Sequence, residues 1–97
     1  MRWRIYDEAV QMIRRRFQFF PEAFCWRGRQ FRVQEVQRSW VVTRPGWRQP
    51  VERRYYQVQC TSGTFEIYQD LRAGTWHLRR ARLHPARIPP ALQLAAA

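Results

Sequence analysis

Arginine and aromatic side chains are the groups in this sequence whose types and spacing point to chemistry. Arginines gather in three local clusters, at residues 14–16, 27–32 and 79–82. A guanidinium group pairs with phosphate oxygens in a bidentate way, and an exposed aromatic ring stacks on an unpaired base. This pattern favours contact with nucleic acid. The residues predicted to make that contact are Arg14, Arg15, Arg16, Arg27, Arg29, Arg32, Trp47, Tyr55, Tyr68, Arg79, Arg80 and Arg82.

Groups suited to catalysis do not converge in the same way. His77 and His84 are the only histidines, and neither has a nucleophile or a paired acid of obvious role nearby in the sequence. The sequence has no glycine-rich phosphate loop, no metal-ligand spacing and no nucleophile elbow. We therefore predict a non-catalytic protein with no cofactor and no metal ion.

The cysteines and two acidic residues have structural interpretations. Cys60 shares a face with apolar residues, where a thiol packs as a small hydrophobic group. Cys25 falls on the face opposite Trp26. Glu35 and Glu66 lie on predicted strands, where we expect surface ion pairs with arginines. Two cysteines are too few for a disulfide scaffold, so a reducing, cytoplasmic location is predicted.

Length and charge limit the classes of protein that fit. The 97 residues are enough for one small domain, and 18 basic against 7 acidic residues give a net charge of +11. All 18 are arginine, a choice that a coding bias would also produce. The excess charge favours an anionic partner, either nucleic acid or an acidic protein surface. No apolar run approaches the roughly 20 residues of a membrane helix, so no membrane contact is expected.

Two hairpins are predicted to position these side chains. The first joins predicted strands at residues 22–27 and 29–38, and a two-residue turn at Arg27-Gly28 sets Phe24 opposite Phe31 and Trp26 opposite Arg29. Beyond this hairpin the apolar residues move to even positions, namely Val36, Trp40 and Val42. The change of parity predicts a bulge or bend near residues 34–35, as in a sheet that curls toward a barrel.

The second hairpin has the clearest alternation. With Ser62-Gly63 as its turn, Cys60 is predicted to face Phe65 and Val58 to face Ile67. Residues 75–83 form a further strand that carries Trp76 and Leu78 inward and His77 outward. Together these strands predict an antiparallel meander.

Three segments remain outside the two hairpins. Residues 7–17 have either helical spacing, with Asp7 as the N-cap, or a strand at residues 8–13 followed by a basic loop. Residues 44–50 contain two prolines and a glycine and are predicted to form a loop. Residues 84–97 are rich in proline and alanine, and we expect this tail to be disordered after a domain at residues 1–83.

The segment AFCWRGRQFRVQEV, at residues 23–36, resembles an uncharacterised family of small, mainly-β bacterial domains with the pattern x-W-R-G-R-x-aromatic-x-V-x-E-V. Trp40 and the strands at residues 55–58, 65–70 and 76–80 continue the likeness, which covers residues 5–83. The resemblance implies that residues 8–13 are a strand. Family members are often encoded beside Y-family translesion polymerases, which implies a link to DNA repair.

The predicted fold is mainly β, a meander of about five antiparallel strands curled into a barrel or half-barrel. The expected function is an accessory module that contacts DNA or RNA. The alternative is an adaptor that docks on a translesion polymerase or another repair protein. The predicted core comprises Phe24, Trp26, Phe31, Val33, Val36, Val58, Cys60, Phe65, Ile67, Trp76 and Leu78.

Three neighbouring phenylalanines, Phe17, Phe19 and Phe20, bear on the adaptor alternative. Burial at one end of a barrel is the favoured interpretation of this cluster. If the three rings are exposed, they instead form a contact patch for a partner or for a second copy in a homodimer.

Overall fold

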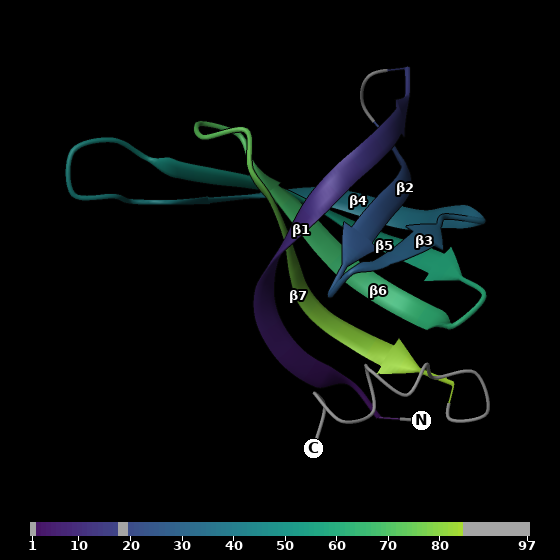
Figure 1. The fold of residues 1–97 in the computed structure, drawn as a ribbon. Coiled ribbons are helices and arrows are strands. Elements are labelled where there is room, and N and C mark those ends of the chain that lie inside the picture. The colour runs from purple at the N-terminus through teal and green to yellow at the C-terminus, as the bar shows by residue number, and fades with distance from the viewer. Residues whose placement is uncertain (1, 18–19, 85–97) are drawn as a thin grey trace.

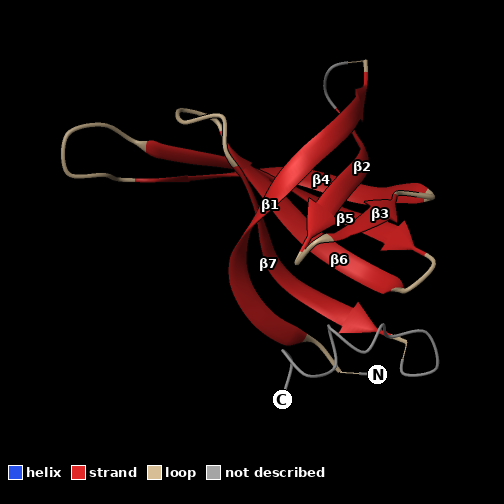
Figure 2. Cartoon of the chain, viewed as in Figure 1, coloured by secondary structure: helices blue, strands red, loops and turns tan. Residues whose placement is uncertain are grey.

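Seven β-strands make up the part of the protein that the computed structural model describes, residues 2–17 and 20–84 (Figure 1). The strands are β1 (Arg4–Arg16), β2 (Phe20–Trp26), β3 (Arg29–Arg32), β4 (Glu35–Arg44), β5 (Val51–Cys60), β6 (Gly63–Asp70) and β7 (Trp76–Leu83). The described residues include no helix (Figure 2). Accordingly, none of them forms a helix that could cross a membrane.

All seven strands belong to one antiparallel sheet with the order β3–β2–β1–β7–β6–β5–β4. The long strand β1 joins the two halves of this sheet, because residues 4–10 pair with β7 while residues 11–16 pair with β2. The sheet turns within β1, so the β2–β3 hairpin packs over β6 (Figure 1). The sheet runs from β3 at one edge to β4 at the other and is not closed into a barrel.

The apolar core lies between the β2–β3 hairpin and the central strands. Phe24, Trp26 and Phe31 of the hairpin surround Phe65 of β6 at ring-centroid distances of 5.6, 6.1 and 5.0 Å. Nine of the eleven predicted core residues are buried, and Val33 and Val36 pack half-buried against them. Because so small a domain buries only about 60% of its unfolded surface, these aromatic rings carry much of the stability.

The predicted register of the first hairpin is confirmed. Phe24 pairs with Phe31, and Trp26 pairs with Arg29. Arg27 and Gly28 form the turn, with φ angles of 51° and 74°. Positive φ at both central positions gives a turn whose twist matches that of the flanking strands.

The predicted register of the second hairpin is wrong by two residues. Val58 pairs with Phe65 and Cys60 with Gly63, so the turn is Thr61-Ser62. Gly63 belongs to β6, where it pairs with Cys60 of β5 and Leu83 of β7. A side chain does not fit at this position, because a Cβ would lie 2.2 Å from the carbonyl oxygen of Arg82 in β7. Side chains stay on their predicted faces, since the faces of a strand repeat every two residues.

The change of parity near residues 34–35 marks a junction between strands. Here the chain leaves β3 at one edge of the sheet and enters β4 at the other edge. A bulge follows at Gln37, so that Val36 faces the core while Trp40 lies on the opposite face. In a regular strand, even-numbered residues share one face, so the sequence pattern had placed Val36 and Trp40 on the same side of the sheet.

Residues 7–16 belong to a strand rather than a helix, as the family resemblance implies for residues 8–13. The basic loop expected after residue 13 is wrong, because residues 14–16 continue β1 and pair with β2. The predicted count of five strands is therefore too low. The difference comes from β1 and from residues 33–34, which divide the predicted strand at residues 29–38 into β3 and the start of β4.

The expected burial of the phenylalanine cluster is wrong for Phe17, which is 83% exposed at the end of β1. Phe20 is 37% exposed and packs edge-on against Tyr56, with a centroid distance of 6.3 Å. Phe19 and the predicted disordered tail after His84 lie outside the described residues.

Candidate nucleic-acid interface

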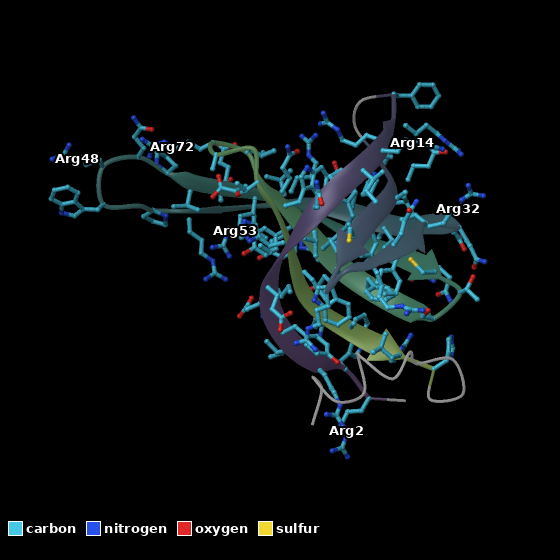
Figure 3. All side chains as sticks on the ribbon, viewed as in Figure 1. Arg2, Arg14, Arg32, Arg48, Arg53 and Arg72 are labelled. Atoms are coloured by element: carbon cyan, nitrogen blue, oxygen red, sulfur yellow. The ribbon has the colours of Figure 1, made fainter. Side chains whose placement is uncertain are left out.

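The predicted arginine clusters do not share one face of the protein. Figure 3 shows Arg14 and Arg32 on the side of the sheet formed by β1, β2 and β3. Arg48 and Arg72 lie at the other end of the molecule, near the loop that joins β4 and β5. The positive charge is therefore divided among separate surfaces with different surroundings.

Arg27, in the turn of the β2–β3 hairpin, is held by Glu8 of β1. Its Nε donates a 2.7 Å hydrogen bond to Oε1 of Glu8, and its Nη2 forms an ion pair with Oε2. The indole Nε1 of Trp26 donates a second hydrogen bond, of 2.9 Å, to the same Oε1. The hydrogen bond from Arg27 holds the pKa of Glu8 below its usual range. Arg27 thus ties the hairpin to β1.

Arg79 and Arg80 are bound to Glu66, whose side chain is buried on the face of the sheet opposite the core. The Nη2 of Arg80 lies 3.2 Å from Oε1 of Glu66, and the Nε of Arg79 lies 3.5 Å from Oε2. The guanidinium of Arg82 lies 5.1 Å from the ring centroid of Trp3. The ion pair predicted for Glu66 is confirmed, although the carboxylate itself is buried.

Arg14 and Arg32 share the outward face of β1, β2 and β3. Arg14 pairs with Ala23, and Ala23 pairs with Arg32, so the two arginines flank this small residue on one face. Their strands are two apart, which separates the backbones by about 10 Å. Both side chains are exposed, and neither has an ion pair among the described residues. Ala23 between them is buried, at 4% exposed. We call the surface formed by Arg14 and Arg32 the hairpin surface.

The other predicted arginines of these strands are also exposed. Arg15 and Arg16 end β1, where they pair through the backbone with Pro21 and Phe20. Arg29 begins β3, beside the hairpin turn. The structure therefore places several cationic side chains around the end of the sheet that contains the hairpin surface.

Tyr55 and Tyr68 belong to a ladder of rings across four strands, on the face opposite the core. The ladder runs Trp40, Tyr55, Tyr68 and His77, one ring each from β4 to β7, with successive centroid distances of 5.4, 5.0 and 4.9 Å. The guanidinium of Arg53 lies 4.7 Å from the Tyr68 centroid. Tyr55 and Tyr68 are only 6% and 7% exposed, so their ring faces contact protein rather than solvent.

Trp47, in contrast, is 89% exposed in the loop between β4 and β5. The guanidinium of the adjacent Arg48 lies 4.5 Å from the centroid of its ring. Of the three aromatic residues predicted to stack on bases, Trp47 is the one whose side chain is open to solvent. Its neighbour Arg48 lies at the opposite end of the molecule from Arg14 and Arg32 (Figure 3).

Sequence reasoning missed the arginines that lie around Trp47. Arg44 ends β4, Arg48 follows Trp47, and Arg72 lies in the turn between β6 and β7. The segment RPGWRQP between two strands was the available signal for Arg44 and Arg48. Arg72 could not be recognised in this way, because it is distant from Trp47 in the sequence. It reaches this end of the molecule only through the pairing of β5 with β6.

The histidine, cysteine and acidic residues considered for catalysis or ion pairing lie on different strands of the sheet. His77 stacks on Tyr68, and its Nε2 lies 2.9 Å from the hydroxyl of Thr75. Burial raises the pKa of the Cys60 thiol to about 12, and Cys25 is half-buried. Glu35 is exposed in β4 with no ion pair among the described residues. Within residues 2–17 and 20–84, no cluster of three potential metal ligands is present.

Comparison with known proteins identifies one family. Residues 1–82 match the family model described as a domain of unknown function (DUF6504). No curated protein and no solved structure matches the chain. The match agrees with the resemblance of the sequence to an uncharacterised family, and it covers β1 to β6 and all but the last residue of β7.

Proposed function

Because the chain belongs to this family of domains of unknown function, whose description names no activity, we propose a function from the geometry. The protein is a non-catalytic module that binds nucleic acid, DNA or RNA, through exposed arginine side chains. A role near a translesion polymerase or in DNA repair is part of this proposal and follows from the sequence resemblance alone.

The proposal rests on which charged side chains are already bound within the fold. Glu8 binds Arg27, Glu66 binds two arginines of β7, and Asp70 accepts hydrogen bonds from backbone N–H groups of the β6–β7 turn. Three of the seven acidic side chains are thereby engaged within the sheet. Arg14 and Arg32 keep their charge at the surface, where it attracts an external anion.

The distribution of charge favours a long polyanion over a compact acidic protein. The hairpin surface and the arginines near Trp47 lie at opposite ends of the molecule (Figure 3). A nucleic-acid strand carries a charge at every nucleotide and can contact both ends at once. An acidic patch on a folded protein would meet one of them.

The proposal is tested by fluorescence anisotropy with a labelled 20-nucleotide single strand and the corresponding duplex, over a series of salt concentrations. Wild-type binding should weaken steeply with salt, with a log-log slope of about −0.7 to −0.9 for each phosphate contacted. The double variant Arg14→Gln/Arg32→Gln should reduce the magnitude of that slope by roughly 1.4 to 1.8, for two lost contacts. Absence of wild-type binding at low salt contradicts the proposal.

A matched control distinguishes direct contact with phosphates from attraction by the net charge of the protein. The double variant Arg2→Gln/Arg4→Gln removes the same charge elsewhere. Arg2 lies away from Arg14 and Arg32 (Figure 3), and Arg4 pairs with Ala81 of β7. This variant should lower affinity modestly through the overall field and leave the salt slope nearly unchanged. Equal effects of the two double variants would assign binding to net charge rather than to the hairpin surface.

The exposure of Phe17 favours the adaptor as a second candidate function. Phe17 and Phe20 line an open groove of about 550 Å³ together with Val33, Val36 and Arg38. An exposed aromatic side chain beside a groove is a frequent feature of protein interfaces. Nuclease-treated extracts distinguish the two functions, because a stoichiometric protein partner that is retained by the wild type and lost by Phe17→Ser supports the adaptor.

A further inference from the structure

The hairpin formed by β4 and β5 extends beyond the rest of the sheet. The last pair between β5 and β6 is Arg53 with Asp70, whereas β4 and β5 continue to pair as far as Arg44 and Val51. Residues 43–52 therefore form a two-stranded projection, which we call the arm (Figure 1). Trp47 lies in the loop at the tip of the arm.

The arm is held in a defined shape. A Cβ at Gly46 would lie 2.0 Å from the carbonyl oxygen of Gln49, so the loop folds tightly on itself before and after Trp47. Pro45 and Pro50 restrict the backbone at both ends of the loop. At the base, the backbone N–H of Leu71 donates a 3.0 Å hydrogen bond to the carbonyl oxygen of Glu52. The loop that carries the indole is thus closed on itself, and the arm is tied at its base to the β6–β7 turn.

The charges around the tip are mainly positive. Arg48 lies over the Trp47 ring at 4.5 Å, Arg44 lies where β4 enters the loop, and Arg72 lies at the adjacent turn. Among residues 43–52, Glu52 is the one acidic residue, and it pairs with Thr43 across β4 and β5. With Trp47 89% exposed, its indole remains open to a flat ligand despite the contact with Arg48.

We propose that Trp47 stacks on an unpaired base of a nucleic acid while Arg44 and Arg48 contact the phosphates beside that base. This inference rests on the proposed function and specifies its substrate as single-stranded or locally unpaired nucleic acid. Paired bases in a duplex have both faces covered by their neighbours, whereas an unpaired base offers a free face to an aromatic ring. The fixed shape of the arm reduces the entropy lost on binding.

Variants that leave the net charge unchanged distinguish stacking of Trp47 on a base from electrostatic attraction to phosphates. In the anisotropy assay, Trp47→Ala should weaken binding to the 20-nucleotide single strand about 5- to 100-fold, with an unchanged salt slope. Trp47→Phe should keep most of the affinity, because it keeps a ring. Binding to the fully paired duplex should change little in either variant. Phe17→Ala is the control for loss of an exposed ring elsewhere and should bind as the wild type does.

Intrinsic fluorescence gives a direct observation of the stacked indole. The single strand should quench part of the tryptophan emission of the wild type, and the quenching should be lost in Trp47→Phe, which still binds. Of the other four tryptophans, Trp26 and Trp76 are buried, while Trp40 stacks on Tyr55 and Trp3 packs against Arg80 and Arg82. Any quenching that remains in Trp47→Phe measures their contribution.

The results separate the two proposals. If the wild type binds oligonucleotides and Trp47→Ala binds the single strand equally well, the inference is wrong while the proposed function stands. If the wild type does not bind at low salt, both fail. Vesicles containing phosphatidylserine provide the remaining comparison. Binding of such vesicles that depends on Trp47, without Trp47-dependent binding of single strands, would overturn the inference and assign the tip to a membrane surface.

Discussion

Tyr55 and Tyr68 lie against each other across β5 and β6, with ring centroids 5.0 Å apart, and each is less than a tenth exposed. Trp40 and His77 extend the row on either side. Directly opposed aromatic side chains stabilise neighbouring strands through their contact area and their ring geometry. On the face opposite the core, this ladder therefore supports the sheet, and Trp47 is the one of the three aromatic residues predicted to stack on bases whose ring is exposed.

Replacement of Tyr55 by alanine should destabilise the fold. The change removes a ring that contacts both Trp40 and Tyr68, and the free energy of unfolding should fall by about 3 kcal/mol, as for other buried aromatic residues. Urea denaturation measures the loss. Trp47→Ala is the matched control, since its exposed ring should change stability by less than about 0.5 kcal/mol. A Tyr55→Ala protein of unchanged stability that lost oligonucleotide binding would assign the ring to base stacking instead.

Alternation along the chain was sufficient to predict the core and the positions of both hairpins, because these features depend on neighbouring residues. The spacing of Phe24, Trp26 and Phe31 around the Arg27-Gly28 turn is enough to place their side chains on one face. The packing of Tyr55 and Tyr68 could not be predicted in this way. It depends on the register between strands and on Trp40, whose face is set by a bulge.

The role of Gly63 shows why the register of the second hairpin was mispredicted. A serine followed by glycine is a common turn, and no local residue contradicts that interpretation. The decisive contact is with the carbonyl oxygen of Arg82, which reaches Gly63 only after β7 has paired with β6. A glycine required for close approach between strands has the same sequence signature as a glycine required for a turn.

Gly63→Ala should therefore cost more stability than the same change in a turn. The new methyl group would meet the Arg82 carbonyl oxygen at 2.2 Å, and the φ of 149° is unfavourable for alanine. We expect a loss of roughly 3 kcal/mol or more, measured by thermal unfolding. Gly28→Ala is the control, because a Cβ there meets nothing within 4 Å. Its φ of 74° should cost about 1 to 2 kcal/mol, so equal losses would argue against the close contact at Gly63.

The bond between Glu8 and Arg27 should make stability depend on pH in the acid range. Because the hydrogen bond from Arg27 lowers the pKa of Glu8 in the folded state, the ionised carboxylate favours folding. This contribution is complete above the unfolded pKa of about 4.3 and is lost as the pH falls through the lower folded value.

Glu8→Gln tests this dependence. At pH 7 it should lower the free energy of unfolding by about 1 kcal/mol, a small value because the Glu8 side chain is 36% exposed and screened by solvent. Urea titrations at pH 7 and pH 3 give the comparison. The difference between the two proteins should narrow below about pH 4. A constant difference at both pH values would show that the charge of Glu8 does not contribute.

Cys60 should react with thiol reagents only when the core opens. Its side chain is 2% exposed, and burial raises the pKa of the thiol to about 12, so at pH 8 roughly one molecule in ten thousand carries the thiolate. The variant Cys25→Ser leaves Cys60 as the single thiol. Its labelling by iodoacetamide, followed by mass spectrometry, should be absent on the timescale in which the urea-unfolded protein is fully modified. Labelling of the folded variant as fast as of the unfolded chain would mean that β5 separates readily from its neighbours and that the apolar core is not the stable part of the sheet.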